Sequence, residues 1–207
     1  MTVENRSTTL KTVFLPVVVL FFLCALVLLL VSRLTEEIIN NNAREYELRT
    51  VKKLMSLPYD NDLLNDYLLI DEPQPVSGNK PLTIYRARQD KNIIGVVFKP
   101  VRAMGYSGPV ELAVGMAKDG TVLDVEVLSH HETEGLGGQV DRQRSGWLSI
   151  FTSISLSGMQ PGDWAPRSQG GKFDQISGAT ITSRGIINAI HETLEYHRLN
   201  HAKLYME

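Results

Sequence analysis

The sequence predicts an α+β fold in which a single N-terminal transmembrane helix precedes one domain with an antiparallel sheet and flanking helices. Three observations predict this fold. An uncharged apolar run lies near the N-terminus, segments of alternating apolar and polar residues follow, and a four-residue apolar repeat marks the C-terminal segment. The part after the apolar run has about 150 residues, which is enough to bury a single core.

The composition excludes several classes of function. The 207 residues include 21 basic and 23 acidic side chains, so the formal net charge is −2. A nucleic-acid partner requires a basic surface against the phosphates, and this charge balance argues against one. The single cysteine, Cys24, lies inside the apolar run. The sequence therefore has no internal disulfide and no cysteine ligands for iron–sulfur or zinc sites in its soluble part.

The apolar run from Val13 to Val31 predicts a transmembrane helix over residues 13–32. At 1.5 Å per residue the run spans roughly 28 Å, close to the hydrocarbon thickness of a bilayer. It is long for the apolar part of a signal peptide, and no small-residue cleavage site follows it. Arg6 and Lys11 favour a cytoplasmic N-terminus over residues 1–12, although further basic residues beyond the run leave the orientation open on charge alone.

Residues 33–57 are predicted to form a stalk helix between the membrane and the domain. Thr35 is suited to cap the helix, acidic residues follow it, and a pair of lysines lies near its end. Pro58 ends the helix. The domain itself is expected over residues 58–207, with a proline-rich loop early in it.

The antiparallel sheet is predicted from period-2 alternation. The segments that read as strands are 82–88, 93–98, 110–117 and 121–128. A tight turn at Asp119-Gly120 joins the last two. The last strand is expected to turn Leu123, Val125 and Val127 inward and the polar residues between them outward, so that one face of the sheet is buried.

A C-terminal helix is predicted to begin near Thr182. Ile186, Ile190 and Leu194 recur every four residues and form its buried stripe. Three histidines on or after this helix are expected to face solvent: His191, His197 and His201.

The segment before this helix combines small residues with a threonine. Gly178 and Ala179 precede Thr180 at the entrance to the helix. Free backbone N–H groups and the helix dipole favour an anion such as a phosphate there, and small side chains let a bulky group approach. An ordinary N-cap made by serine and threonine is the simpler interpretation, and these residues alone favour it.

A longer window changes this balance. The residues that match the pattern D-x-x-[ST]-G-A-T-x-[ST] are Asp174, Ser177-Gly178-Ala179-Thr180 and Thr182. The match resembles the flavinylation site of the G subunit of Rnf-type (Rsx-type) electron transport complexes; the C subunit of the sodium-translocating NADH:quinone reductase is similar there. In that family a flavin transferase moves FMN from FAD to the last threonine and forms a phosphoester. The resemblance implies covalent FMN on Thr180 and recognition of Asp174 by the transferase. The residues that it implies around the phosphate are Ser177, Gly178, Ala179 and Thr182.

A second match lies in the loop HHETEGLG, residues 130–137. It looks like the H-x-E-T-P-G-L-G loop that lies beside the flavin in the same family, with Glu134 in place of the usual proline, a change that loosens the turn. The residues implied near the flavin ring are Glu132, Thr133, Leu136 and Gly137. The histidine pair does not predict a metal site, because adjacent residues on a strand point to opposite faces and the known zinc patterns are absent.

The resemblance covers essentially the whole chain and implies an electron-carrier subunit of a membrane complex that couples electron transfer to ion translocation. The redox chemistry belongs to the flavin, so no catalytic acid or base is expected. The implied partners are the other subunits, the flavin transferase and the bilayer, with the domain on the periplasmic side of a bacterial inner membrane. The alternatives are a C-type subunit of the sodium-translocating NADH:quinone reductase, which is typically longer, and an anchored domain that binds a partner or ligand without redox work.

Overall fold

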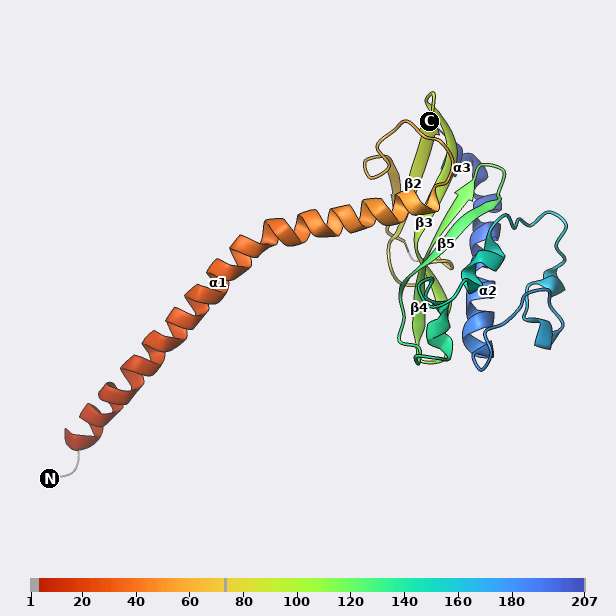
Figure 1. Ribbon diagram of the computed structural model, residues 1–207. Helices are drawn as coiled ribbons and strands as arrows, with labels where there is room; N and C mark the ends of the chain where they lie inside the picture. Colours follow the sequence, from red (N-terminus) through yellow and green to blue (C-terminus); the bar gives the residue numbers. More distant parts are fainter. Residues whose placement is uncertain (1–3, 73, 207) are drawn as a thin grey trace. The chain divides into compact units, whose positions relative to one another are not determined.

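The computed structural model describes residues 4–72 and 74–206. Its helices and strands are α1 (Glu4–Leu54), β1 (Tyr67–Ile70), β2 (Leu82–Gln89), β3 (Asn92–Met104), β4 (Pro109–Ala117), β5 (Val122–Ser129), α2 (Thr180–Leu199) and α3 (His201–Tyr205) (Figure 1). Short 3-10 helices lie between β5 and α2, among them η1 (Gly137–Val140) and η2 (Trp147–Phe151). The chain divides into two compact units, one up to Tyr46 and the other from Glu47 onward. The predicted α+β class with one long apolar N-terminal helix is confirmed.

The helix α1 is continuous, where the sequence suggests a membrane helix and a separately capped stalk. The hydroxyl of Thr35 donates to the carbonyl of Val31 at 2.9 Å, one turn back in the same helix. Thr35 therefore lies inside α1, and its predicted role as an N-cap is wrong. One window of α1 is long and apolar enough to cross a membrane, and none of that window is buried within the structure. Exposed apolar side chains over such a length suit a lipid environment.

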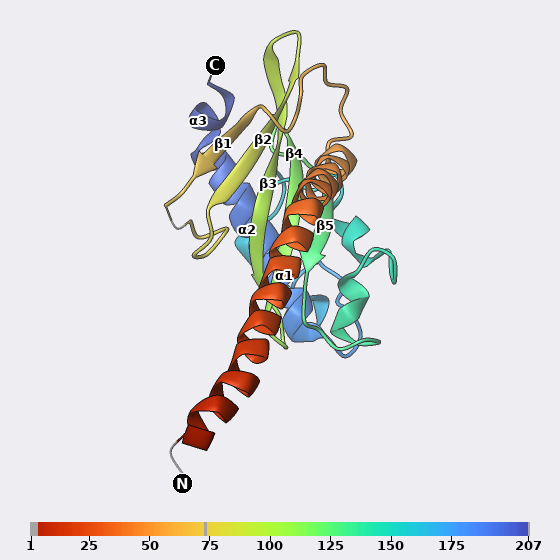
Figure 2. The ribbon, with the colours of Figure 1, turned by 90° about the vertical axis from the view of Figure 1, so that its left-hand side faces the viewer.

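The sheet is an antiparallel meander in the order β1-β2-β3-β4-β5. A two-residue turn joins β2 to β3, and its residues Asp90 and Lys91 have φ of 50° and 70°. Positive φ at both positions is the conformation that matches the twist of a hairpin. The edge strand β1, which has no clear period in the sequence, pairs with β2 from Tyr67 to Ile70. Figure 2 looks onto the sheet, with α2 behind it.

Both faces of the sheet are covered, whereas the alternation of apolar and polar residues predicts one buried face. On the first face, Ile186, Ile190 and Leu194 of α2 are buried in the main core, so the predicted stripe of α2 is confirmed. On the second face, Val51 and Leu54 at the end of α1 pack against strand residues of β2, β3 and β4. This second core explains why the domain unit begins inside α1.

The strand β5 departs from simple alternation because of a bulge. Met116 pairs with Val122 and Gly115 with Asp124, so Leu123 is an extra residue in the register. Val122 therefore lies in the core against α2, while Leu123 packs with the core on the opposite face. The expectation that Leu123 faces inward together with Val125 is wrong for this reason.

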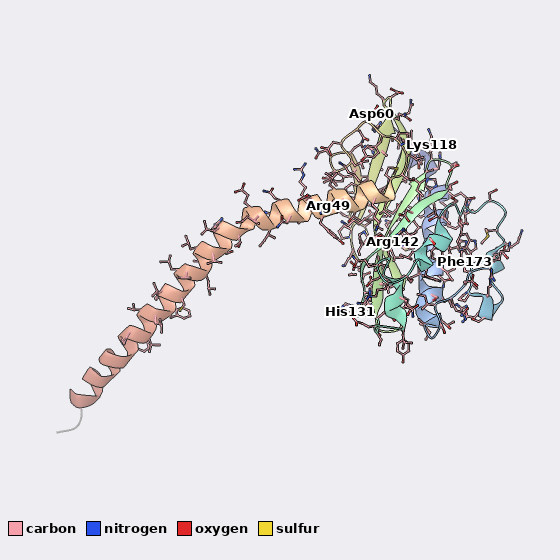
Figure 3. All side chains as sticks on the ribbon, in the orientation of Figure 1. Arg49, Asp60, Lys118, His131, Arg142 and Phe173 are labelled. Atoms are coloured by element: carbon pink, nitrogen blue, oxygen red, sulfur yellow. The ribbon has the colours of Figure 1, made fainter. Side chains whose placement is uncertain are left out.

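The loop after β5 is held against that strand by charge. Arg142, labelled in Figure 3, forms ion pairs with Asp124 and, at 3.3 Å, with Glu126. Glu126 also pairs with Lys53 at 2.6 Å, which links the end of α1 to β5. These pairs fix the start of the irregular region that leads to η2.

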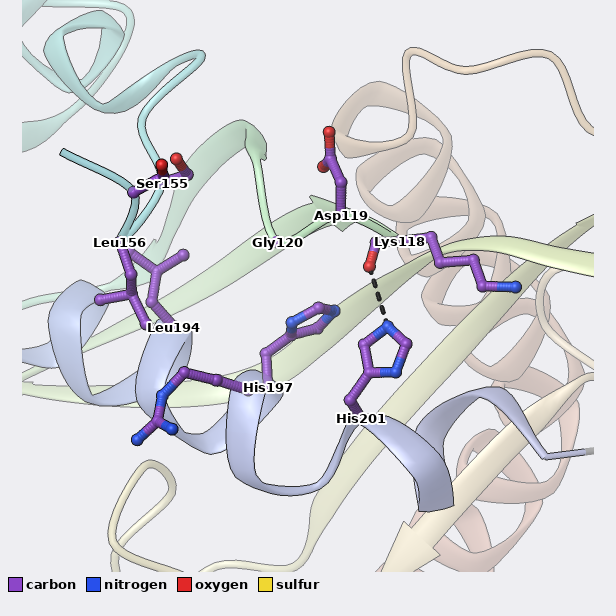
Figure 4. Close-up of a pocket in the computed structure, with 10 residues that line it drawn as sticks. Lys118, Asp119, Gly120, Ser155, Leu156, Leu194, His197 and His201 are labelled. Carbon is purple, nitrogen blue, oxygen red and sulfur yellow. Dashed lines mark hydrogen bonds between the residues drawn. The ribbon is translucent and has the colours of Figure 1, made fainter.

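The C-terminal end of α2 contains a buried histidine. His197 is 3% exposed, and its Nε2 lies 2.9 Å from the hydroxyl of Tyr205. The predicted solvated position is therefore wrong for His197, whereas His201 is exposed and its Nε2 lies 3.1 Å from the carbonyl of Lys118. Both histidines line a pocket of about 290 Å³ beside the Asp119-Gly120 turn (Figure 4).

Candidate functional site

A cavity of about 480 Å³ lies at the N-terminal end of α2. This volume is in the range of small-molecule and cofactor sites. Three segments of the chain form its wall: the turn between β3 and β4, the loop after β5 and the start of α2. Segments that lie far apart in the sequence thus meet at one cavity, and two of them contain the residues of the two sequence motifs.

Most of the predicted site residues line this cavity. From the loop after β5 these are Glu132, Thr133, Leu136 and Gly137, and from the start of α2 they are Gly178, Ala179, Thr180 and Thr182. Ser177 is exposed and does not line the cavity. Asp174 also lies outside it, where its carboxylate pairs with Arg167 at 3.2 Å on the surface.

The two sequence motifs do not predict two of the lining residues, Tyr106 and Ile181. Tyr106 lies in the β3–β4 turn, between Gly105 and Gly108, and an aromatic residue between glycines is the signal that would have singled it out. Ile181 occupies a position that the threonine motif leaves unspecified. Tyr106 is 75% exposed and Ile181 55% exposed, and together with Leu136 at 47% they give the cavity an apolar rim.

The start of α2 has no side-chain cap. Gly178 has a φ of +75°, a left-handed conformation that glycine adopts without strain, and Ala179 is the N-cap. The hydroxyl of Ser183 is engaged, since it accepts the N–H of Ile176 at 3.0 Å. An ordinary cap by serine or threonine, the simpler interpretation of this motif, is therefore wrong.

Backbone donors remain free at this helix start. Within the described residues, the N–H groups of Thr180, Ile181 and Thr182 have no hydrogen-bond partner. The positive end of the helix dipole lies at the same place. Free donors in this field are suited to bind an anion, and Thr180 is the first residue of the helix at this place.

The loop after β5 rests directly on the threonine motif. A Cβ added at Gly178 would lie 2.9 Å from Cδ2 of Leu136, so glycine allows this approach. Glu134, at the position of the family proline, pairs with Arg144 at 2.8 Å on the surface. The hydrogen bond from Arg144 holds the pKa of Glu134 below its usual value. An ion pair thus restrains this position.

Glu132 is turned into the wall of the cavity. Its Oε1 accepts the backbone N–H of Ser107 at 3.0 Å, and its Oε2 accepts the hydroxyl of Thr182 at 2.9 Å. The side chain is only 8% exposed. The carboxylate therefore binds protein groups on both oxygens.

Residues 105–195, which contain every segment of this cavity, match the family model described as FMN-binding domain. The G subunit of the ion-translocating oxidoreductase complex of Shewanella loihica is 34% identical over 183 residues, which are 88% of this chain and 86% of that protein. The chain belongs to the G-subunit family. Its relative in Pseudoalteromonas atlantica is 36% identical over 71% of this chain and 68% of its own length. The corresponding protein of Vibrio cholerae is 34% identical over 79% of this chain and 78% of its own.

Among solved structures, the crystal structure of Shewanella oneidensis NqrC is similar to this chain, with 22% identity and a TM-score of 0.46. The similarity covers 70% of this chain and 74% of NqrC. Of the two kinds of complex suggested by the sequence, the relatives assign the chain to the G subunits.

The residues of the G-subunit cavity fit FMN. The uncapped start of α2 supplies N–H donors for a phosphate, and Thr180 has a hydroxyl beside them. The apolar side chains of Tyr106, Leu136 and Ile181 suit a flat aromatic ring. A polar end and an apolar rim in one cavity correspond to the two ends of this cofactor.

Proposed function

We propose that this protein is an electron carrier with FMN bound covalently to Thr180, and a component of a membrane complex that couples electron transfer to ion translocation. One observation carries the proposal: Thr180 lines a cavity of about 480 Å³ at a helix start whose first N–H groups have no hydrogen-bond partner among the described residues. Membership of the G-subunit family and the match to an FMN-binding domain support the identity of the cofactor and the complex.

The attachment would be made by a flavin transferase with FAD as the donor. The Oγ of Thr180 forms a bond to the phosphorus of the FMN phosphate, the phosphoanhydride bond of FAD breaks, AMP leaves and the hydroxyl proton is released. Among the described side chains, none forms a hydrogen bond with the Thr180 hydroxyl. The base that removes the proton is therefore expected to come from the transferase.

Several groups of the cavity would have a role in the finished protein. The N–H groups of residues 180–182 would hold the phosphate, and Gly178 and Ala179 would leave space for it. Leu136 and Ile181 would pack against the ring and limit the access of water. When bound, FMN supplies the electron chemistry, and the protein supplies its position and electrostatic surroundings. No acid or base of this chain is assigned to that chemistry.

We further propose that residues 13–32 cross the inner membrane of a bacterium once, with residues 1–12 in the cytoplasm and residues 33–207, which contain the rest of α1 and the domain, on the periplasmic side. The apolar window of α1 supports a single crossing. The basic residues before the window support the orientation. A covalent bond would keep the cofactor attached outside the cytoplasm, where free flavin is scarce.

The test is in-gel fluorescence of the denatured protein after co-expression with a flavin transferase. We expect a fluorescent band in the natural chain and none in Thr180→Ala. Thr182→Ser is the matched control, since it keeps the buried hydroxyl that binds Glu132 and leaves Thr180 intact.

One result would contradict the proposal. If the natural chain gives no band while a known substrate of the transferase is labelled, covalent FMN is ruled out. An anchored domain that binds a partner or ligand without redox work then becomes the better explanation.

A further inference from the structure

Glu132 is a buried acid to which the proposed function gives no chemical task. Both of its carboxylate oxygens act as acceptors, one for the Ser107 N–H and one for the Thr182 hydroxyl. Acceptance at both oxygens is the pattern of an ionised carboxylate. The arginines of the same loop pair elsewhere, Arg144 with Glu134 and Arg142 with Asp124. Among the described residues, no lysine or arginine forms an ion pair with Glu132.

The backbone around this carboxylate is shaped to admit it. A Cβ at Gly105 would overlap Oε1 of Glu132, and a Cβ at Gly137 would overlap Oε2. Thr182, which donates to the carboxylate, also accepts the N–H of Tyr106 at 3.3 Å. The β3–β4 turn, the loop after β5 and the start of α2 therefore meet at one side chain.

The helix start explains how a buried acid is tolerated here. Thr182 is the third residue of α2, so the carboxylate lies at the positive end of the helix dipole. That field stabilises an anion, as do two hydrogen bonds with good distances. The negative charge thus stays in the cavity wall without a cationic partner.

We propose that Glu132 is a positioning residue for the flavin site, which ties the three wall segments together and fixes a negative charge in the wall of the cavity that FMN would occupy. This inference rests on the proposed function for FMN. A fixed negative charge opposes the gain of an electron nearby, and the effect is strong where water is excluded. The carboxylate therefore keeps the midpoint potential of the flavin low.

The experiment compares Glu132→Gln with the natural chain and with Glu134→Gln, all as full chains loaded with FMN. Glu134 is a matched control, because its side chain lies in the same loop, is 81% exposed and does not line the cavity. Loading is established first by fluorescence of the denatured protein. A redox titration followed by absorbance then gives the midpoint potential. Amide hydrogen exchange over residues 105–108 is measured separately on the unloaded chains.

We expect the flavin in Glu132→Gln to have a more positive midpoint potential than in the natural chain. We expect the midpoint potential in Glu134→Gln to equal that of the natural chain. We also expect faster exchange over residues 105–108 in Glu132→Gln alone, because glutamine cannot accept with both of its terminal atoms. A loaded Glu132→Gln chain with an unchanged potential overturns the proposal. If Glu132→Gln does not load with FMN, the exchange rate over residues 105–108 tests the proposal. A faster rate than in the natural chain supports the positioning role, and an unchanged rate overturns it. Failure of the natural chain to load contradicts the proposed function instead.

Discussion

Asp174 belongs to the threonine motif by sequence but lies outside the cavity. Its carboxylate and the guanidinium of Arg167, 3.2 Å apart, are both about two-thirds exposed. Exposed pairs of this kind stabilise a fold by less than about 1 kcal/mol. A side chain with little structural value, exposed on the surface and six residues before Thr180 in the sequence, is available to the flavin transferase. This location supports its proposed role in recognition.

We predict that Asp174→Ala lowers flavin loading while the thermal unfolding of the domain stays nearly unchanged. The band intensity in denaturing gels measures loading, and circular dichroism measures unfolding. Arg167→Ala is the control, because it removes the same ion pair and keeps the carboxylate. Normal loading of Asp174→Ala would show that the transferase does not use this residue.

The helix α2 packs so closely on β3 that one glycine in it has no substitute. A Cβ at Gly185 would overlap the carbonyl oxygen of Met104. Alanine is favoured over glycine in a helix interior by about 1 kcal/mol, so intrinsic propensity alone predicts stabilisation. Overpacking typically costs about 1–3 kcal/mol, and here backbone atoms would have to move.

We therefore predict that Gly185→Ala lowers the free energy of unfolding by about 2 kcal/mol, the opposite sign to helix propensity. Urea denaturation of the domain measures the change. Asn188→Ala, at an exposed position of the same helix, serves as the control and is expected to leave stability within about 0.5 kcal/mol. A stabilised Gly185→Ala domain would mean that α2 and β3 can separate easily.

The other end of α2 gives the domain a pH dependence. Burial lowers the pKa of His197 to about 4 from the usual 6.5, with a further contribution from His201, while Asp119 acts in the opposite direction. The unfolded chain therefore binds a proton that the folded chain does not bind between these two values. Stability from this group is complete above about pH 6.5 and is lost as the pH falls towards 4.

We predict that His197→Gln flattens this part of the stability profile, because glutamine keeps a polar partner for Tyr205 and takes up no proton. The measurement is the melting temperature between pH 4 and pH 7.5. His131→Gln, a change at an exposed position, should keep the natural slope. An unaltered slope in His197→Gln would assign the acid sensitivity to other groups.

For the molecule as a whole, the end of α1 is part of the domain and covers the second face of the sheet. Leu54 is fully buried there, and a Cβ at Gly115 of β4 would overlap its carbonyl oxygen. We predict that Leu54→Ala lowers the free energy of unfolding of the domain by about 2–5 kcal/mol, since it leaves a cavity in this core. Thermal unfolding in detergent tests this. Leu34→Ala, at an exposed position of the same helix, is the control.

The sequence predicts the elements better than it predicts how they meet. The strands follow from alternation and α2 from its four-residue stripe, because both signals are local. The cover over the second face depends on Val51 and Leu54 meeting residues far along the chain, and the position of Leu123 depends on a bulge in the pairing. No local pattern contains either.

The candidate site shows the same division. The two motifs predict most residues around the cavity, including Thr180, because family resemblance preserves which residues gather there. They do not predict the direction of the Glu132 carboxylate, which depends on contacts with Ser107 and Thr182. The motifs do not predict that Tyr106 lines the cavity, because Tyr106 belongs to neither of them.

The unsatisfied first turn of α2 has a consequence for the lifetime of the protein. Without a phosphate, the N–H groups of residues 180–182 have no partner in the part of the chain that the structure describes, so this turn opens more readily than the rest of the helix. An attached phosphate supplies acceptors and a favourable charge at the helix start. Chains that the transferase has missed would thus open this turn more often, and proteases cleave an open turn in preference to a closed one. We expect the cell to clear such chains faster, so that the cofactor also marks which copies persist.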